Sequence, residues 1–208
     1  MGVNLRNVKN ILFDLGNVLI DIDPYLTIQE IENYGGVSWN ESSEREALEQ
    51  WLHAFERGQI TPLNFCQHLC NILDLEISFE EFVEVWNKTL LEIPEERWSL
   101  IRELSEHYNL YLLSNTNEVH IRTIFYMYKR VYGQENLFEF MNKEYYSNLI
   151  GMRKPDRQIF EYVLNDSGIK ANETIFIDDS RRNILAASEL GFQTYLIGVN
   201  EEVSDFFN

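Results

Sequence analysis

Four short apolar runs, separated by helical patterns, constrain the fold more than any other feature of this sequence. The runs are VKNILF at 8–13, LYLLS at 110–114, TIFID at 174–178 and QTYLI at 193–197. Each is continuous rather than alternating, which is typical of a strand buried on both faces. Strands that alternate with helices form a parallel sheet covered by helices on both sides.

The helical patterns of the second half of the chain lie at 94–108, 117–133, 155–168 and 180–191. Pro94 and Pro155 are well placed to start helices, and Gly168 and Gly191 to end them, because these residue types favour those positions. We therefore predict an α/β fold whose core is a Rossmann-like, doubly wound parallel sheet.

Residues 24–92 interrupt the alternation of strands and helices. This stretch contains helical patterns only, and it follows the first strand directly, where a second strand is expected. We predict an all-helical domain at 24–92, inserted into a core domain formed by residues 1–23 and 93–208. The hinges are expected near 20–24 and 90–94.

Composition narrows the choice of partners. The chain has 208 residues, 45% of them hydrophobic and 13% aromatic, which suits a packed globular protein rather than a disordered one. Its net charge of −17 repels phosphate backbones and anionic lipids, so we expect neither a nucleic-acid partner nor a membrane partner. We expect a monomer or a homodimer.

Cysteine usage and hydropathy bear on the compartment. Cys66 and Cys70 lie four residues apart, which suits one face of a helix, and we predict buried thiols rather than a disulfide or a zinc site. No signal-peptide pattern is present, and no apolar run approaches the roughly 20 residues of a membrane span. A cytoplasmic location is the expectation.

Polar residues stand where the apolar runs end, and ligands bind beyond the carboxyl ends of strands in an open parallel sheet. The residues concerned are Asp14, Ser114, Asn115, Asp178 and Asp179, with Lys154 just before a helical pattern. Singly, each has an ordinary structural explanation, as a helix N-cap or a solvated turn residue.

As a set, these residues match phosphoryl transfer through an aspartyl intermediate. The nucleophile is then a carboxylate that forms an acyl phosphate, which water later cleaves. A hard cation with oxygen ligands screens the repulsion between carboxylate and phosphate. A hydroxyl and an ammonium group hold the remaining phosphate oxygens as charge develops.

Four ordered motifs resemble those of the haloacid dehalogenase superfamily of hydrolases. They are FDLGNVL, LLSNT, RKP and FIDDSRRN, and the resemblance spans the whole chain. It implies that the helical insertion is a cap domain. It also implies a metal site that holds Mg²⁺ through Asp14, the backbone carbonyl of Gly16 and Asp178, with Asp179 ligating through water or anchoring the site.

The same resemblance assigns the phosphate-binding residues. Asp14 is the implied nucleophile, and Ser114, Asn115 and Lys154 are the implied phosphate contacts. Asn183 is implied either to orient the loop of the fourth motif or to contact the substrate.

One position departs from the family pattern. Most phosphatases of the family carry an aspartate two residues after the nucleophile as general acid and base, and here Gly16 stands there. Asn17 follows, at another position where the family has glycine, and asparagine tolerates a left-handed backbone best among the other residues. Haloacid dehalogenases lack the second aspartate too, and a non-catalytic binding protein could also dispense with it.

Three segments around this departure favour one interpretation. DLGNVLIDID, GMRKP and FERGQIT resemble a bacterial subgroup of sugar-phosphate phosphatases, including glucose-1-phosphate phosphatases, that carries the same glycine. The resemblance thus implies a metal-dependent phosphatase of small phosphorylated metabolites, most simply sugar phosphates. A dehalogenase-type hydrolase and a binding-only protein remain the alternatives.

Four further charged residues have open roles. Asp21 and Asp23 lie in the connection to the helical insertion, where a hinge or turn role competes with contact to the leaving group. Glu56 and Arg57 precede Gly58 in a turn that could face the substrate.

Overall fold

Five parallel strands form a single sheet in the computed structural model, which describes residues 7–37, 39, 44–132 and 139–207. The spatial order is β3-β2-β1-β4-β5, so the first strand of the chain lies in the middle. The strands are β1 (Asn10–Phe13), β2 (Asn109–Ser114), β3 (Lys143–Tyr146), β4 (Thr174–Asp178) and β5 (Gln193–Leu196). The predicted α/β fold class is confirmed.

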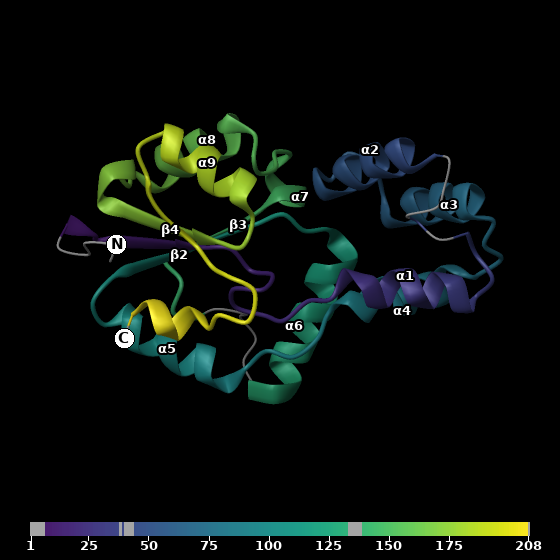
Figure 1. Ribbon diagram of the computed structural model, residues 1–208, viewed down its shortest axis with the longest axis horizontal. Helices are drawn as coiled ribbons and strands as arrows, with labels where there is room; N and C mark the ends of the chain where they lie inside the picture. The colour runs from purple at the N-terminus through teal and green to yellow at the C-terminus, as the bar shows by residue number, and fades with distance from the viewer. Residues whose placement is uncertain (1–6, 38, 40–43, 133–138, 208) are drawn as a thin grey trace.

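Helices cover both faces of this sheet (Figure 1). On one face lie α8 (Arg157–Ser167) and α9 (Arg181–Glu189), and on the other lie α5 (Glu95–Ser105) and α6 (Glu118–Tyr132). Short elements complete this part of the chain: α7 (Ser147–Ile150) and the 3-10 helices η3 (Ala171–Glu173) and η4 (Val203–Phe206).

Side chains along the strands alternate between the two faces, as the pleat requires. In β1, Leu12 packs with Phe160 and Val163 of α8, whereas Ile11 and Phe13 belong to the core on the opposite face. All four residues of β1 are buried. A strand with apolar neighbours on both sides reads as a continuous apolar run, which explains why β1, β2 and β4 were predictable.

The helical segment, which we define as residues 24–92, lies to one side of the sheet (Figure 1). It comprises α1 (Pro24–Asn33), α2 (Arg45–Glu56), α3 (Pro62–Leu73), α4 (Phe79–Trp86) and the 3-10 helix η2 (Asn87–Thr89). These helices share an apolar core, to which Val119 of α6 also contributes, and in which Phe55, Phe65 and Phe82 are at most 1% exposed.

The chain enters and leaves the helical segment at one place. Ile22 and Leu90 form an antiparallel bridge there, so the two connections run side by side. Thr61 and Ser78 cap α3 and α4 through their hydroxyl groups, which satisfies backbone N–H groups at the helix starts.

Some predicted boundaries were wrong, and one strand was missed. The first strand begins at Asn10 rather than at residue 8, and the helix expected from Pro155 begins at Arg157 after an extended N-cap. Strand β3 escaped prediction because its first two residues, Lys143 and Glu144, are charged and not buried, which leaves only two buried positions.

Two smaller expectations can be compared with the structure. Cys66 and Cys70 are free thiols on α3 with their sulfur atoms 4.0 Å apart; Cys66 is buried, and Cys70 is only partly so. Within the described residues, helices of sufficient length and apolarity to cross a bilayer are absent.

Candidate active site

Lys154 lies at the centre of the candidate site, at the carboxyl ends of the strands. Its ammonium nitrogen donates to Asp14 Oδ1 at 2.6 Å, to Asp178 Oδ2 at 2.8 Å and to the carbonyl of Leu113 at 2.7 Å. The side chain is 1% exposed, so all three donors are used inside the protein. Three strands thus contribute to one cluster: Asp14 follows β1, Leu113 belongs to β2, and Asp178 ends β4.

Asn115 holds the backbone of Lys154 in place. Its side-chain oxygen accepts from the Lys154 N–H at 2.8 Å, and its side-chain nitrogen donates to the Lys154 carbonyl at 2.9 Å. Both ends of the amide are therefore occupied. The expectation that Asn115 adds a donor to the phosphate stays a prediction, and the structure shows its side chain holding the backbone of Lys154.

Asp178 is fixed from three directions, and it is fully buried. Its Oδ1 accepts from the Ser180 N–H at 2.7 Å, and the Asn183 amide donates to both carboxylate oxygens, at 2.9 and 3.0 Å. Asn183 therefore holds the Asp178 carboxylate in position, and its expected role toward the loop or the substrate stays a prediction.

Asp14, Asp178 and Asp179 form a cluster of acidic oxygens. One ligand atom from each lies within 4.8 Å of the others. Asp179 also accepts from the Asn17 side chain at 3.0 Å, and Asn17 has a φ of 56°, the left-handed backbone conformation that the sequence predicted it to tolerate.

The electrostatics of the cluster call for a cation. Burial raises the pKa of the Asp14 carboxyl to about 7; the Lys154 ammonium opposes this, and the Asp178 charge adds to it. Burial alone would lower the pKa of Lys154, but the charges of Asp14 and Asp178 raise it above its ordinary value. One ammonium thus faces three carboxylates, two of which are buried.

This donor set fits Mg²⁺. The ion prefers hard oxygen ligands and is usually held by one or two carboxylates together with water. Asp14, Asp178 and Asp179 supply such oxygens from two neighbouring strand ends. A divalent ion there would also favour the charged form of Asp14.

Ser114 and the following loop border the cluster. Ser114 is the last residue of β2 and is buried, with its hydroxyl 3.5 Å from the Asn115 carbonyl. Ser147 fixes the next turn of this loop, because its hydroxyl donates to the Thr116 carbonyl at 3.1 Å and accepts from the Thr116 N–H at 2.9 Å.

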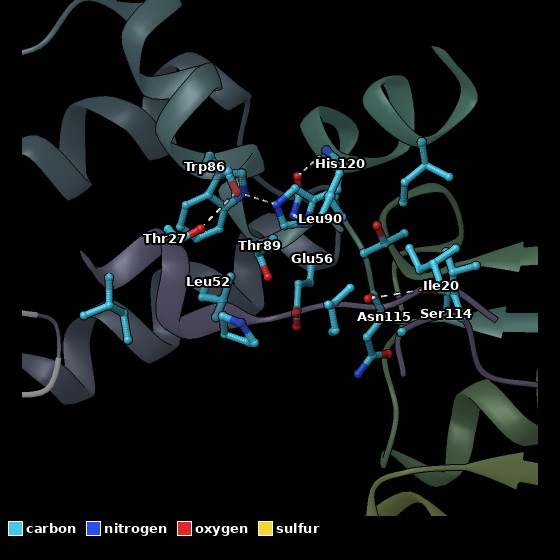
Figure 2. Close-up of a pocket in the computed structure, with 18 of the residues that line it drawn as sticks. Ile20, Thr27, Leu52, Glu56, Trp86, Thr89, Leu90, Ser114, Asn115 and His120 are labelled. Atoms are coloured by element: carbon cyan, nitrogen blue, oxygen red, sulfur yellow. Dashed lines mark hydrogen bonds between the residues drawn. The ribbon is translucent and has the colours of Figure 1, made fainter. Parts of the chain in front are cut away.

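A pocket of about 420 Å³ opens beside the cluster, between the strand ends and the helical segment. Figure 2 shows Thr27, Leu52 and Trp86 of the helical segment on one side and Ser114 and Asn115 on the other. Gly16 also lines the pocket, so the pocket begins within two residues of Asp14.

Ile22 packs over Gly16 within this pocket. A Cβ atom added at position 16 would lie 2.7 Å from Ile22 Cδ1. The place next to the expected nucleophile is therefore apolar. The Gly16 carbonyl as a metal ligand remains a prediction.

Asp21 and Asp23 are both engaged elsewhere. Asp21 Oδ1 pairs with the buried Arg97 guanidinium at 2.9 Å, and Asp23 caps α1 by accepting from the Tyr25 N–H at 2.9 Å. These contacts match the hinge and turn roles considered for them from the sequence.

Two ion pairs join the helical segment to the residues that flank Lys154. Glu56 accepts from Arg153 Nε at 2.8 Å, and Arg57 donates to Asp156 at 2.8 Å. Gly58 completes this contact, since its φ is 64° and a Cβ atom there would lie 2.1 Å from the Asn148 carbonyl oxygen. The turn expected at Gly58 is present.

Sequence reasoning missed several residues that shape the site. Arg153 was quoted only as part of a motif, and Ser147 and Ile22 received no role. A signal existed for Ser147, because a serine that directly follows two aromatic residues resembles the other strand ends. The ion-pair role of Arg153 had no local signal, since its partner lies 97 residues away.

Comparison with protein families now identifies the fold. A model described as haloacid dehalogenase-like hydrolase matches residues 8–191, which is most of the chain. The chain belongs to the haloacid dehalogenase-like hydrolases. The predicted family and the predicted enzyme class, a hydrolase, are thereby confirmed.

Two curated relatives of this hydrolase are named as phosphatases. D-ribitol-5-phosphate phosphatase of Bacteroides thetaiotaomicron is 29% identical over 190 residues, covering 90% of this chain and 91% of its own. A sesquiterpene phosphatase of Aspergillus oryzae is 29% identical over 187 residues, covering 88% of this chain and 86% of its own.

A solved structure extends the likeness to three dimensions. A haloacid dehalogenase family enzyme from Bacteroides thetaiotaomicron, in complex with magnesium and inorganic phosphate, superposes with a TM-score of 0.85. The two proteins are 33% identical, and the match covers 97% of this chain and all of the other.

Proposed function

We propose that this hydrolase is a magnesium-dependent phosphatase that cleaves phosphate monoesters of small organic molecules through an aspartyl-phosphate on Asp14. The observation that carries the proposal is the bonding of Lys154 to Asp14 and Asp178 within the acidic cluster, beside a pocket of about 420 Å³. Relatives named as phosphatases, and one solved with magnesium and phosphate, support it.

The chemistry follows from the positions of the side chains. The Asp14 carboxylate attacks phosphorus, a bond forms between its oxygen and phosphorus, and the bond to the leaving oxygen breaks. Water then attacks the phosphorus of the aspartyl-phosphate, which releases inorganic phosphate and restores Asp14. The sum is one ester and one water converted to one alcohol and one phosphate.

Other residues of the site would accommodate the negative charge of the phosphate group. Lys154 keeps its positive charge because two carboxylates contact it, and this charge beside Asp14 would attract the phosphate group. Ser114 offers a hydroxyl at the same edge. Asn115 and Asn183 act by holding Lys154 and Asp178 in position.

Magnesium would be held by Asp14, Asp178, Asp179 and the Gly16 carbonyl, and when bound it supplies positive charge that screens the carboxylate from the phosphate. Asp178 is buried, and Asn183 holds both of its carboxylate oxygens in position, so this ligand is already oriented.

The helical segment acts as a cap in this proposal, as an inserted domain at 24–92. Its apolar core is nearly all formed by its own residues, its two connections to the rest of the chain run side by side, and it forms much of the pocket wall. A cap over the pocket excludes water from the reacting groups and restricts substrates to small molecules.

The leaving group is the part of the substrate that differs between the named relatives. The relatives act on very different molecules by name, a polyol phosphate in one case and a sesquiterpene in the other. The sequence predicts a sugar phosphate as substrate, and this stays a prediction.

Phosphate release measured with a panel of small phosphate esters, with Mg²⁺ and with excess EDTA, tests the proposal. We expect release only with Mg²⁺. Halide release from 2-haloacids in EDTA would instead establish the dehalogenase alternative. Binding of phosphate esters without turnover of any would establish the binding-only alternative. Gly16 is the residue that raises this alternative, because it lacks the acid/base carboxylate.

A further inference from the structure

The pocket beside the cluster has an apolar wall. Ten of the twenty described residues that line it are apolar, and they come from both the strand ends and the helical segment. They include Ile20, Ile22, Ile28, Leu52, Trp86 and Leu90, and Figure 2 labels several of them around the opening. A polyol that enters such a wall loses hydrogen bonds to water and regains few of them.

We infer that this pocket binds an uncharged, largely apolar leaving group, so that the substrates are phosphate monoesters of hydrocarbon-like alcohols or phenols. The inference rests on the proposed phosphatase function. It names the chemical class of the part that is released.

Thr27, Glu56 and His120, three of the polar residues in the wall, are already engaged within the protein. Outside the 114–117 loop, Thr27 donates to the Val85 carbonyl, and His120 uses one ring nitrogen on the Trp86 carbonyl and the other on the Asn117 amide. Glu56 accepts from Arg153. These groups therefore offer little to the row of hydroxyls on a sugar or polyol.

The charges of the wall exclude a second anionic group on the substrate. Its charged side chains, among the described lining residues, are Glu49 and Glu56, and neither a lysine nor an arginine is present there. Glu49 accepts from Arg45, as Glu56 does from Arg153. A leaving group with a carboxylate or a second phosphate would find no lysine or arginine among the described lining residues to pair with.

The volume of the pocket and the surroundings of Gly16 both agree with a small, apolar leaving group. A volume of about 420 Å³ lies within the range of pockets that hold small organic molecules. Ile22 covers the position where a side chain at residue 16 would stand, so the substrate meets a methyl group beside the nucleophile. An apolar group gains from this contact, whereas a hydroxyl does not.

A series of 4-alkylphenyl phosphates tests the inference, because lengthening the alkyl chain adds apolar surface and scarcely changes the acidity of the phenol. We expect kcat/KM to rise about four-fold per methylene until the pocket is full, the factor that corresponds to ~0.8 kcal/mol per buried CH₂. The matched polar series carries hydroxyl groups on chains of the same length and should show no rise.

Two leucine variants provide the control in the protein itself. Leu52→Asn changes the pocket wall and should flatten the dependence on chain length. Leu63→Asn changes an exposed leucine on α3 outside the pocket and should leave the dependence as in the wild type. Dissociation constants of the matching non-hydrolysable arylphosphonates, measured by calorimetry, report the same preference without turnover.

The outcomes separate the two proposals. A flat alkyl series, or a clear preference for the hydroxylated series or for glucose 1-phosphate, overturns the apolar pocket and leaves the phosphatase standing. Tighter phosphonate binding with longer chains, but no phosphate release from any ester, overturns the phosphatase and supports the apolar pocket. Phosphate release with a flat response of both phosphonate binding and kcat/KM rejects the inference even if a leucine variant fails to fold.

Discussion

Ile22 Cδ1 lies 2.7 Å from the position that a Cβ atom at residue 16 would take. Gly16 and Ile22 thus form a complementary pair, in which the missing side chain of one makes room for the methyl group of the other. The general acid that most phosphatases of this family carry is replaced by an apolar contact, and Asp21 and Asp23 are held elsewhere.

The first prediction concerns this pair. Gly16→Asp in an Ile22→Ala background gives a carboxylate space to protonate the leaving oxygen, so esters with poor leaving groups should speed up by about 10²–10⁴-fold. The measurement is the rate of Asp14 phosphorylation plotted against the pKa of the leaving group, steep in the wild type and flatter in the double variant. Ile22→Ala alone is the control, and a flat plot for the wild type would show that another acid already serves.

The second prediction concerns Asp14. Asp14→Asn keeps an acceptor for Lys154 but removes the nucleophile, so turnover should fall by more than about 10³-fold while the fold is retained. Acid-quenched mass spectrometry should find an aspartyl-phosphate in the wild type and none in the variant. Turnover within ten-fold of the wild type would exclude Asp14 as nucleophile.

The third prediction concerns the ion pair between Glu56 and Arg153, whose side chains are 15% and 17% exposed. A double-mutant cycle of Glu56→Gln and Arg153→Gln, followed by urea unfolding, should give a coupling energy of about 1–2 kcal/mol. The exposed pair Arg157–Glu161 on α8 is the comparison and should give about 0.3–0.5 kcal/mol. Equal couplings for the two pairs would mean that the contact adds nothing beyond a surface pair.

The fourth prediction concerns His120, which lines the pocket. Burial lowers its pKa from 6.5 to about 4, although its hydrogen bond to the Trp86 carbonyl opposes the shift. Between these two pH values the unfolded chain binds a proton that the folded chain does not, so stability falls as pH drops from 6.5 to 4. The loss from this residue is at most about 3 kcal/mol, and it does not grow below pH 4.

Urea unfolding at several pH values checks this expectation. His120→Gln has no ring to protonate, so the difference in unfolding free energy between wild type and variant should change with pH in this window. His107→Gln removes an imidazole at an exposed position and is the matched control. A constant difference for His120→Gln from pH 7 to pH 4 would contradict the assignment.

Local patterns explain what the sequence could predict. Asp14, Ser114 and Asp178 each follow or end an apolar run, and such a run with a polar end is visible within a few residues. The parallel sheet then brings these ends together, because the carboxyl ends of parallel strands meet at one edge.

The features that were missed depend on contacts between distant residues. Asn115 bonds to the backbone of Lys154, 39 residues away, and Glu56 pairs with Arg153, 97 residues away. The contact of Ile22 with Gly16 spans only six residues, yet it depends on how the connection to the helical segment turns back. Residue types alone carry no signal for such geometry.

The central position of β1 has a consequence for how the chain is made. Asn10 pairs with Asn109 and with Thr174, so the partners of this strand are synthesised 99 and 164 residues later. At about 5–20 residues per second, the nascent strand waits on the order of ten seconds or more for its second neighbour. The helical segment, whose core is nearly all local, can collapse in the meantime, whereas the strand that leads to Asp14 stays exposed. The sheet can be completed only after β4 emerges, and we expect its assembly to be the slow step of folding because such distant pairings form slowly.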